Sequence, residues 1–282
     1  MPIIVNGNPT RNRPMLHIDN DVVQNPRRVI SDMEVQDTAA IDWVCKIVDL
    51  NRSGNRATGF LVEENLIMTN DHVLKAVESS LKEVEVWFGW HREPSNRDVV
   101  GFSGEVVFRD EALDVAILGI TDTPESASVA VIDVNHVPIV GDTVLVVGYP
   151  GESKGSAAHA SPSVSANAHG DARFIGRKRV SPGKLVDASR FQLLHDCSTT
   201  NGSSGSPMVD KNSDCVIGIH SGWTPWWVSD LNRTIPMAVI AEALDTAGIP
   251  LFTEPAAEPV LVGGTTNVGE FRCSPPPTTL PS

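Results

Sequence analysis

Short runs of β-branched, aromatic and other apolar residues follow one another at close spacing, and this pattern constrains the fold more than any other feature. The first set of runs covers residues 43–48, 59–62, 66–68, 84–88, 104–108 and 115–118. The second set covers residues 143–147, 184–186, 191–194, 207–209 and 216–219. Such runs, separated by turn residues, are typical of strands in an all-β sandwich or barrel. An acidic stretch with Thr, Ser and Pro at 121–128 separates the two sets, so we expect two similar all-β lobes.

The segments outside these runs complete the predicted domain organisation. Residues 1–26 show no sustained periodicity and predict a leader or prosegment, and residues 154–170 predict a surface loop. Residues 235–247 have an early proline and are followed by Gly248, a pattern that predicts a helix. Repeated prolines after this helix indicate a tail or linker that does not fold alone. We therefore expect a leader (1–26), an N-terminal lobe (27–125), a C-terminal lobe with its helix (126–247) and a tail (248–282).

The charge of the chain excludes several classes of partner. The 282 residues include 22 Lys and Arg against 35 Asp and Glu, which gives a net charge of −13. This field repels phosphate backbones and anionic lipids, so we expect neither nucleic-acid nor membrane binding. No apolar run approaches the roughly 20 residues that a spanning helix needs. The first residues also lack the apolar stretch of an export signal, which favours a cytoplasmic location.

The cysteines give no evidence for a metal site. Cys45, Cys197, Cys215 and Cys273 are irregularly spaced, which fits neither a dense disulfide framework nor a Cys-x-x-Cys ligand pair. Free buried thiols are the expected state, although the even number would permit two bridges in an oxidising compartment. We expect no metal and no other cofactor.

A candidate nucleophile lies in the glycine- and serine-rich segment from Gly202 to Pro207. Ser204 is flanked there by glycines, which allow a tight turn and close approach of the backbone to a substrate carbonyl. Taken alone, this composition is also that of an ordinary flexible loop. The assignment therefore depends on finding a base and a group that orients the base.

His72 and Asp114 are the candidates for these two roles. His72 follows the predicted strand 66–68, so its imidazole is expected at the end of a strand. Asp114 precedes the apolar run 115–118, where a carboxylate is costly unless it is paired. Each residue alone could serve structure, His72 as a surface or core histidine and Asp114 as the end of a turn. Together with Ser204 they form the chain order His, Asp, Ser.

This order and the segments around it resemble the chymotrypsin-fold, trypsin-like serine proteases, and among them the bacterial glutamyl endopeptidases of the staphylococcal type. The segments that carry the resemblance are 58–61, 66–73, 114–118, 148–151, 198–207 and 216–220. The resemblance covers roughly residues 27–247. It implies an all-β fold of two antiparallel six-stranded β-barrels with a C-terminal α-helix, and an active site in the cleft between the barrels.

The resemblance also implies roles for individual residues. His72, Asp114 and Ser204 would be the catalytic triad of an endopeptidase that forms an acyl-enzyme, and the N–H groups of Gly202 and Ser204 would form the oxyanion hole. A substrate-binding pocket would include Thr199, His220, Ser221 and Gly222. Thr199 and His220 would receive the side chain of glutamate, or of aspartate, on the acyl side of the cleaved bond. Protein or peptide substrates are the expected partners.

The sequence departs from the pattern at two positions. Ser203 stands where the pancreatic relatives have the aspartate that pairs with a newly cut N-terminus, so that activation switch is absent. His220 follows Ser204 by 16 residues, one more than the family's pocket histidine does. The match therefore requires one additional residue in the turn near 212–214. Self-cleavage or a regulatory partner could control activity instead. The alternative function is a catalytically idle trypsin-like domain used for regulated protein binding.

Overall fold

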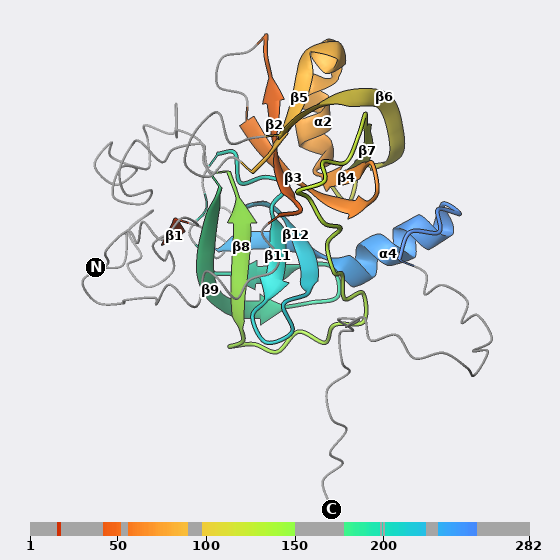
Figure 1. Cartoon of the computed structure of the whole chain (residues 1–282). Helices are drawn as coiled ribbons and strands as arrows, with labels where there is room; N and C mark the ends of the chain where they lie inside the picture. Colours follow the sequence, from red (N-terminus) through yellow and green to blue (C-terminus); the bar gives the residue numbers. More distant parts are fainter. Residues whose placement is uncertain are drawn as a thin grey trace, which may run out of the picture.

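Strands dominate the described part of the chain and form two sets, as the sequence predicts (Figure 1). The computed structural model describes residues 16–17, 42–51, 56–89, 98–149, 178–197, 199, 201–223 and 231–252. The surface loop predicted at 154–170 lies outside the described residues. So do most of the predicted leader and the tail beyond Phe252. These assignments stay predictions.

The first barrel is a closed ring of strands in the order β2-β3-β4-β7-β6-β5. Its strands are β2 (Val44–Asp49), β3 (Arg56–Glu63), β4 (Leu66–Thr69), β5 (Val84–Phe88), β6 (Asp98–Asp110) and β7 (Val115–Ile120). The burial of β5 shows the period of two that a strand with one face on the core requires: Val84, Val86 and Phe88 are buried, and the residues between them are half-buried. β7 is buried along its whole length, as its continuous apolar run predicts.

The second barrel is formed by the strands that follow the connecting segment. These are β8 (Thr143–Gly148), β9 (Arg179–Ala188), β10 (Leu193–His195), β11 (Pro207–Asp210), β12 (Val216–Trp223) and β13 (Asn232–Pro236). They pair in the order β9-β10-β13-β12-β11-β8, and the pairing of β8 with β9 closes the ring. The two-residue strand β1 (Leu16–His17) adds to the outside of β9. The predicted fold class, two antiparallel six-stranded barrels with a C-terminal helix, is confirmed.

The C-terminal helix α4 (Met237–Thr246) is shorter than the predicted helix over 235–247. Ile235 and Pro236 end strand β13 instead, and Pro236 has extended backbone angles at the helix start. Gly248 has a φ of 72° just beyond the helix, which is the left-handed conformation that glycine adopts readily at this position. The sequence did not predict the short helix α2 (Asp71–Val77) or the 3₁₀ turn η2 (Glu78–Glu83).

The connecting segment between β7 and β8 touches both barrels. Ala130 N–H donates to the Leu61 carbonyl of the first barrel at 3.0 Å, and Val216 N–H of the second barrel donates to the Val131 carbonyl at 2.8 Å. One large apolar core continues from the first barrel to α4, and a smaller core of β8–β12 side chains fills the second barrel. These shared contacts fix the two barrels against each other.

The cysteines differ from one another. Cys45 and Cys197 are free and buried, and burial raises the pKa of the Cys45 thiol to about 12, so this thiol is inert. Cys215 is disulfide-bonded, which overturns the expectation of free thiols for this residue. The spacing of cysteines could not reveal this bond, because pairing depends on which thiols the fold brings together.

No helix within the described residues has both the length and the apolar character needed to cross a membrane.

Candidate active site

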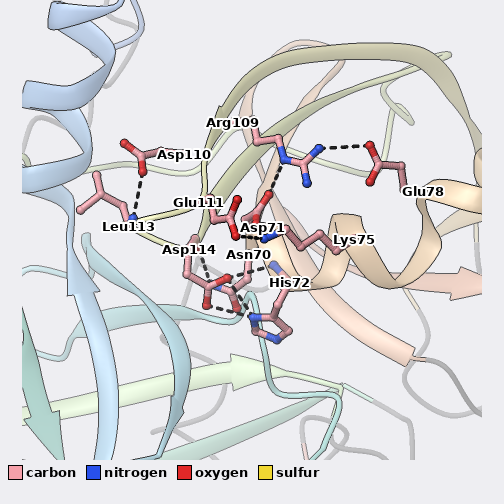
Figure 2. Close-up of polar contacts among 10 residues, drawn as sticks. All are labelled: Asn70, Asp71, His72, Lys75, Glu78, Arg109, Asp110, Glu111, Leu113 and Asp114. Carbon is pink, nitrogen blue, oxygen red and sulfur yellow. Dashed lines mark hydrogen bonds and ion pairs between the residues drawn. The ribbon is translucent and has the colours of Figure 1, made fainter.

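His72 and Asp114 meet at one edge of the first barrel (Figure 2). β4 and β7 pair antiparallel with Thr69 opposite Ala116, so the residues just after β4 and just before β7 lie at the same edge. Nδ1 of His72 lies 2.9 Å from Oδ2 and 3.0 Å from Oδ1 of Asp114. The backbone N–H of His72 donates to Oδ1 of the same carboxylate at 2.9 Å. One carboxylate therefore holds both the backbone and the ring of the histidine.

The backbone of Asp114 is itself held in place. Its φ is 60°, in the left-handed region where Asp and Asn are enriched among residues other than glycine. Its carbonyl accepts a hydrogen bond from Nδ2 of the buried Asn70 at 3.0 Å. Because a carboxylate only accepts hydrogen bonds, Nδ1 of His72 carries the proton, and Nε2 is the basic nitrogen of the neutral ring. The His72 side chain is 47% exposed and Asp114 only 20%, so the base is the more accessible of the two.

A cluster of ion pairs anchors the helix that carries His72 (Figure 2). The buried carboxylate of Asp71 lies 2.6 Å from Nε of Arg109 and 3.0 Å from Nζ of Lys75. Lys75 also pairs with Glu111 at 2.5 Å, and Arg109 with Glu78 at 3.1 Å. Burial acts to raise the pKa of Asp71, but its hydrogen bonds to Lys75 and Arg109 outweigh burial and hold the pKa below its usual range. The cluster therefore links α2 to the turn that ends at Asp114.

Ser204 lies in a tight loop between β10 and β11. Gly202 and Gly205 on either side have φ angles of 93° and 85°, which favour glycine. A side chain at Gly205 would collide with the Thr58 carbonyl oxygen, so glycine is also required for space. Gly205 N–H donates to the His220 carbonyl at 3.0 Å, which ties the loop to β12.

The first barrel binds this loop directly, chiefly through Thr58 of β3. Thr58 N–H donates to the Ser204 carbonyl at 2.9 Å, and its hydroxyl donates to the Gly202 carbonyl at 2.8 Å. The same hydroxyl accepts from Tyr149 N–H at 2.9 Å. The Thr69 hydroxyl donates to the Thr58 carbonyl at 2.8 Å, and Thr69 ends the strand that leads to His72. The loop of Ser204 is therefore packed beside the strand end that carries His72.

The two N–H groups proposed for the oxyanion hole are not bonded within the described residues. The N–H groups of Gly202 and Ser204 donate to no acceptor in the part of the chain that the structure describes. Likewise, no hydrogen bond joins His72 to Ser204 among the described residues. Catalytic hydrogen bonds are often formed only when substrate is bound, so geometry without substrate does not exclude this pair.

The predicted pocket residues come together around β12. The Thr199 hydroxyl donates to Oδ1 of Asn232 at 2.7 Å, and Nδ2 of Asn232 donates to the Cys197 carbonyl at 2.6 Å. Ser221 is buried, and Gly222 has a φ of 146°. The hydroxyl proton of Thr199 is therefore directed at Asn232 in this structure.

Two buried histidines, His195 of β10 and His220 of β12, lie next to these residues. The His220 ring packs edge-to-face against the His195 ring, with centroids 5.5 Å apart. Burial, and then electrostatic repulsion from His72 and Arg233, lower the pKa of His220 to about 3. Burial, and then His220, also lower the pKa of His195 well below its usual value. Both rings are therefore neutral near pH 7, and Nδ1 of His195 accepts the Cys197 N–H at 3.3 Å.

A metal site is not evident in the described ranges, since they hold no cluster of three or more His, Cys, Asp or Glu side chains that could bind an ion.

The structure adds three residues to those that the sequence indicated: Thr58, Asn70 and Arg233. Thr58 occurs in a segment that carries the resemblance, but no local pattern marks its hydroxyl as the link between the barrels. Asn70 precedes a helix, where Asn usually caps, yet its side chain bonds to Asp114 instead. Nε of Arg233 donates to the Ser221 hydroxyl at 2.9 Å, a contact that depends on the pairing of β12 with β13.

Sequence comparisons agree with this architecture. A family model described as the trypsin-like peptidase domain matches residues 57–219. The glutamyl endopeptidase of Staphylococcus epidermidis is 25% identical over 171 residues, which cover 58% of this chain and 53% of that protein. The glutamyl endopeptidase of Staphylococcus aureus (strain MRSA252) is 24% identical over 176 residues, or 60% of this chain and 43% of that protein. The matches thus span about half the length of these curated relatives.

Solved structures show the same fold. A protease of Mycobacterium tuberculosis in its active form has a TM-score of 0.53 at 22% identity, over 78% of this chain and 85% of that chain. A serine endoprotease from Yersinia pestis has a TM-score of 0.53 at 20% identity, over 78% of this chain and 67% of that one. Since the family model covers more than half of the residues and the two barrels match these structures, the chain belongs to the trypsin-like peptidase family.

Proposed function

We propose that this protein is a serine endopeptidase that cleaves protein or peptide substrates through an acyl-enzyme. The observation that carries the proposal is the pairing of His72 with Asp114 in the first barrel. Thr58 of the same barrel is hydrogen-bonded to the loop that contains Ser204. An idle binding domain would have no need for a histidine whose ring and backbone N–H are both held by one carboxylate.

In the proposed reaction, Ser204 attacks the substrate carbonyl while Nε2 of His72 takes its proton. Asp114 keeps the proton of the neutral ring on Nδ1 and stabilises the imidazolium that forms. His72 then protonates the leaving amine, and water completes the second half-reaction by the same route. The N–H groups of Gly202 and Ser204 would bind the oxyanion, and each such donor contributes about 3–4 kcal/mol in comparable enzymes.

The test uses a fluorophosphonate probe that reacts only with an activated serine, together with hydrolysis of a mixed peptide library. Wild-type protein should be labelled and should cleave peptides, and Ser204→Ala and His72→Ala should lose about 10⁴-fold or more of the rate. Ser103→Ala, at an exposed serine of β6, is the matched control and should behave as wild type. A folded wild-type protein that is neither labelled nor active would favour the idle-domain alternative.

We further propose that the protein prefers to cleave after glutamate or aspartate, as the names of its staphylococcal relatives suggest for glutamate. The supporting observation is that Thr199 is hydrogen-bonded to Asn232 of β13, the strand that pairs with β12, and β12 contains His220. To donate to a substrate carboxylate, the Thr199 hydroxyl would exchange its bond to Asn232 for one to the substrate. Hydrogen bonds to a carboxylate are roughly twice as strong as neutral ones, so glutamine should be the poorer substrate. The net charge of −13 opposes this preference at long range, but salt screens it beyond about 8–10 Å.

Mapping of cleavage sites in an unbiased peptide library tests the specificity separately from the chemistry. Wild-type cuts should cluster after acidic residues, and Thr199→Val and His220→Ala should weaken that preference. Cuts mainly after basic or large apolar residues would reject the acidic preference and leave the serine endopeptidase proposal intact. Intact-mass analysis of wild type and Ser204→Ala would also show whether the protein cleaves itself.

A further inference from the structure

Arg233 lies beside the proposed pocket but on the opposite face of strand β13. Along this strand Asn232 and Thr234 are buried and Arg233 is exposed. Asn232 is hydrogen-bonded to Thr199, and Thr234 lies opposite His220 in the pairing of β13 with β12. Asn232 and Thr234 therefore lie on the face of β13 that is directed to the proposed pocket. Successive side chains of a strand point to opposite faces, which places the guanidinium of Arg233 on the other face.

Among the described residues, the positive charge of Arg233 has no carboxylate partner. Its Nε donates to the Ser221 hydroxyl at 2.9 Å, and no Asp or Glu of the described residues lies within ion-pair distance of it. This is unexpected in a chain with 35 acidic residues and a net charge of −13. A guanidinium is always charged and has five N–H donors, so most of its donors are available to a carboxylate from outside the protein.

The end of β12 offers a place where a substrate can lie next to Arg233. β11 pairs with β12 only from Val216 to Ile219, and the Ser204 loop bonds to His220. Residues 221–223 therefore have β13 on one side and no paired strand on the other among the described residues. Such an edge can accept an extended peptide as an added strand.

The alternation of side chains in the peptide then determines which substrate residue reaches Arg233. If the residue on the acyl side of the cleaved bond enters the pocket near His220, the residue immediately before it points to the opposite face. That is the face on which Arg233 and the Ser221 hydroxyl lie. This step rests on the proposed endopeptidase function, but not on the proposed preference for glutamate in the pocket.

We propose that Arg233, positioned by Ser221, forms a second subsite that binds an acidic side chain on the residue immediately before the cleaved one. Guanidinium–carboxylate bonds are charge-assisted and can be bidentate, so this subsite discriminates Glu from the isosteric Gln.

The test compares two peptides that differ only at the residue before the cleaved one, Glu in one and Gln in the other. The cleaved residue is the one that wild-type protein prefers in the library. Wild type should show about a tenfold higher kcat/KM for the Glu peptide, which corresponds to about 1.4 kcal/mol. Arg233→Gln should abolish this ratio, and Arg233→Lys should retain part of it. Arg190→Gln is the matched control, because Arg190 is exposed on the same barrel and paired with Glu242 at 2.8 Å.

A binding arm keeps the outcome independent of catalysis. In the Ser204→Ala protein, the dissociation constants of the same two peptides are measured by calorimetry with and without Arg233→Gln. Equal Glu-to-Gln ratios in Arg233→Gln and in its parent, in both arms, would overturn the inference. Loss of the ratio in Arg233→Gln alone would support it, even if wild-type protein proved catalytically idle or preferred a different residue in the pocket.

Discussion

The hydroxyl of Thr58 in the first barrel donates a hydrogen bond to the carbonyl of Gly202 in the second barrel at 2.8 Å. Since the Gly202 N–H is a proposed oxyanion donor, this bond sets the orientation of the loop that must stabilise the transition state. The arrangement of the site therefore depends on both barrels, and neither barrel alone would hold it.

We predict that Thr58→Val lowers kcat/KM by at least about tenfold and destabilises the fold by about 1–3 kcal/mol, because the Gly202 carbonyl and the Tyr149 N–H each lose a buried partner. Thr58→Ser keeps the hydroxyl and should remain close to wild type in both measurements. Kinetics on a peptide substrate and urea unfolding provide the two readouts. Equal activity in the Val and Ser variants would contradict the role of this bond.

Asp114→Asn should preserve the fold and remove most of the activity. Asn tolerates the left-handed backbone at this position, where φ is 60°. Asn replaces one carboxylate oxygen beside Nδ1 of His72 by an NH₂ donor and removes the negative charge, which favours the wrong tautomer of the ring and no longer stabilises the imidazolium. We expect a loss of about 10⁴-fold in kcat with an unchanged midpoint of urea unfolding. A loss smaller than tenfold would show that Asp114 does not orient the base.

The sequence could predict those parts of the fold and the site that depend on local pattern. The β-rich runs over 84–88 and 115–118 marked two strands of the first barrel, and the motifs around His72, Asp114 and Ser204 marked the candidate triad. β13 was missed because Asn232-Arg233-Thr234 carries little apolar signal before Ile235 and Pro236. α2 was missed because seven residues are too few to show helical periodicity.

The contacts between distant segments could not be predicted. Arg233 gained a candidate role only when the pairing of β12 with β13 placed it beside Ser221. The bonds of the Thr58 hydroxyl depend in the same way on segments far apart in the chain.

Asp71→Asn should destabilise the protein without a direct effect on the chemistry. The Asn side chain keeps the shape but loses the ion pairs with Arg109 and Lys75. Because these two partners are partly exposed, we expect a loss of about 1–3 kcal/mol rather than the larger cost of breaking a fully buried pair. Glu78→Gln, at the exposed rim of the cluster, is the control and should change the stability by less than about 0.5 kcal/mol. Urea unfolding at pH 7 measures both, and equal effects would argue against a special role for the buried carboxylate.

The buried histidines should make the protein sensitive to acid. The pKa values of His195 and His220 are lowered in the folded state, the latter to about 3. Below about pH 6.5 the unfolded chain therefore binds protons that the folded state does not, and the free energy of unfolding falls by up to about 1.4 kcal/mol per pH unit for each histidine. The contribution of the two neutral histidines to the free energy of unfolding is fully present above about pH 6.5, and it is lost as the pH falls toward their pKa values in the folded state. The Gln side chain in His195→Gln can still accept the Cys197 N–H. Between pH 6 and pH 4.5 this variant should lose less free energy of unfolding per pH unit than wild type, by the contribution of one histidine. Parallel slopes for the two proteins in urea unfolding would refute this account.

The bond made by Cys215 should tie the C-terminal tail to the second barrel. Cys45 and Cys197 are free and the chain contains four cysteines, so we predict that Cys273 is the partner of Cys215. Closing a loop of roughly 60 residues stabilises a protein by about 4 kcal/mol in the chain-entropy model. We expect Cys215→Ser and Cys273→Ser to lose the same stability, with no further loss in the double variant. Peptide mapping without reductant should find the 215–273 linkage, and a linkage between two copies of the chain would reject it.

The same bond tests the expected cytoplasmic location. Forming it transfers two electrons from the thiols to a disulfide oxidant, as happens in oxidising compartments. Peptide mapping of protein from its native source should therefore find Cys215 reduced if the protein is cytoplasmic, and bonded if it is located in an oxidising compartment.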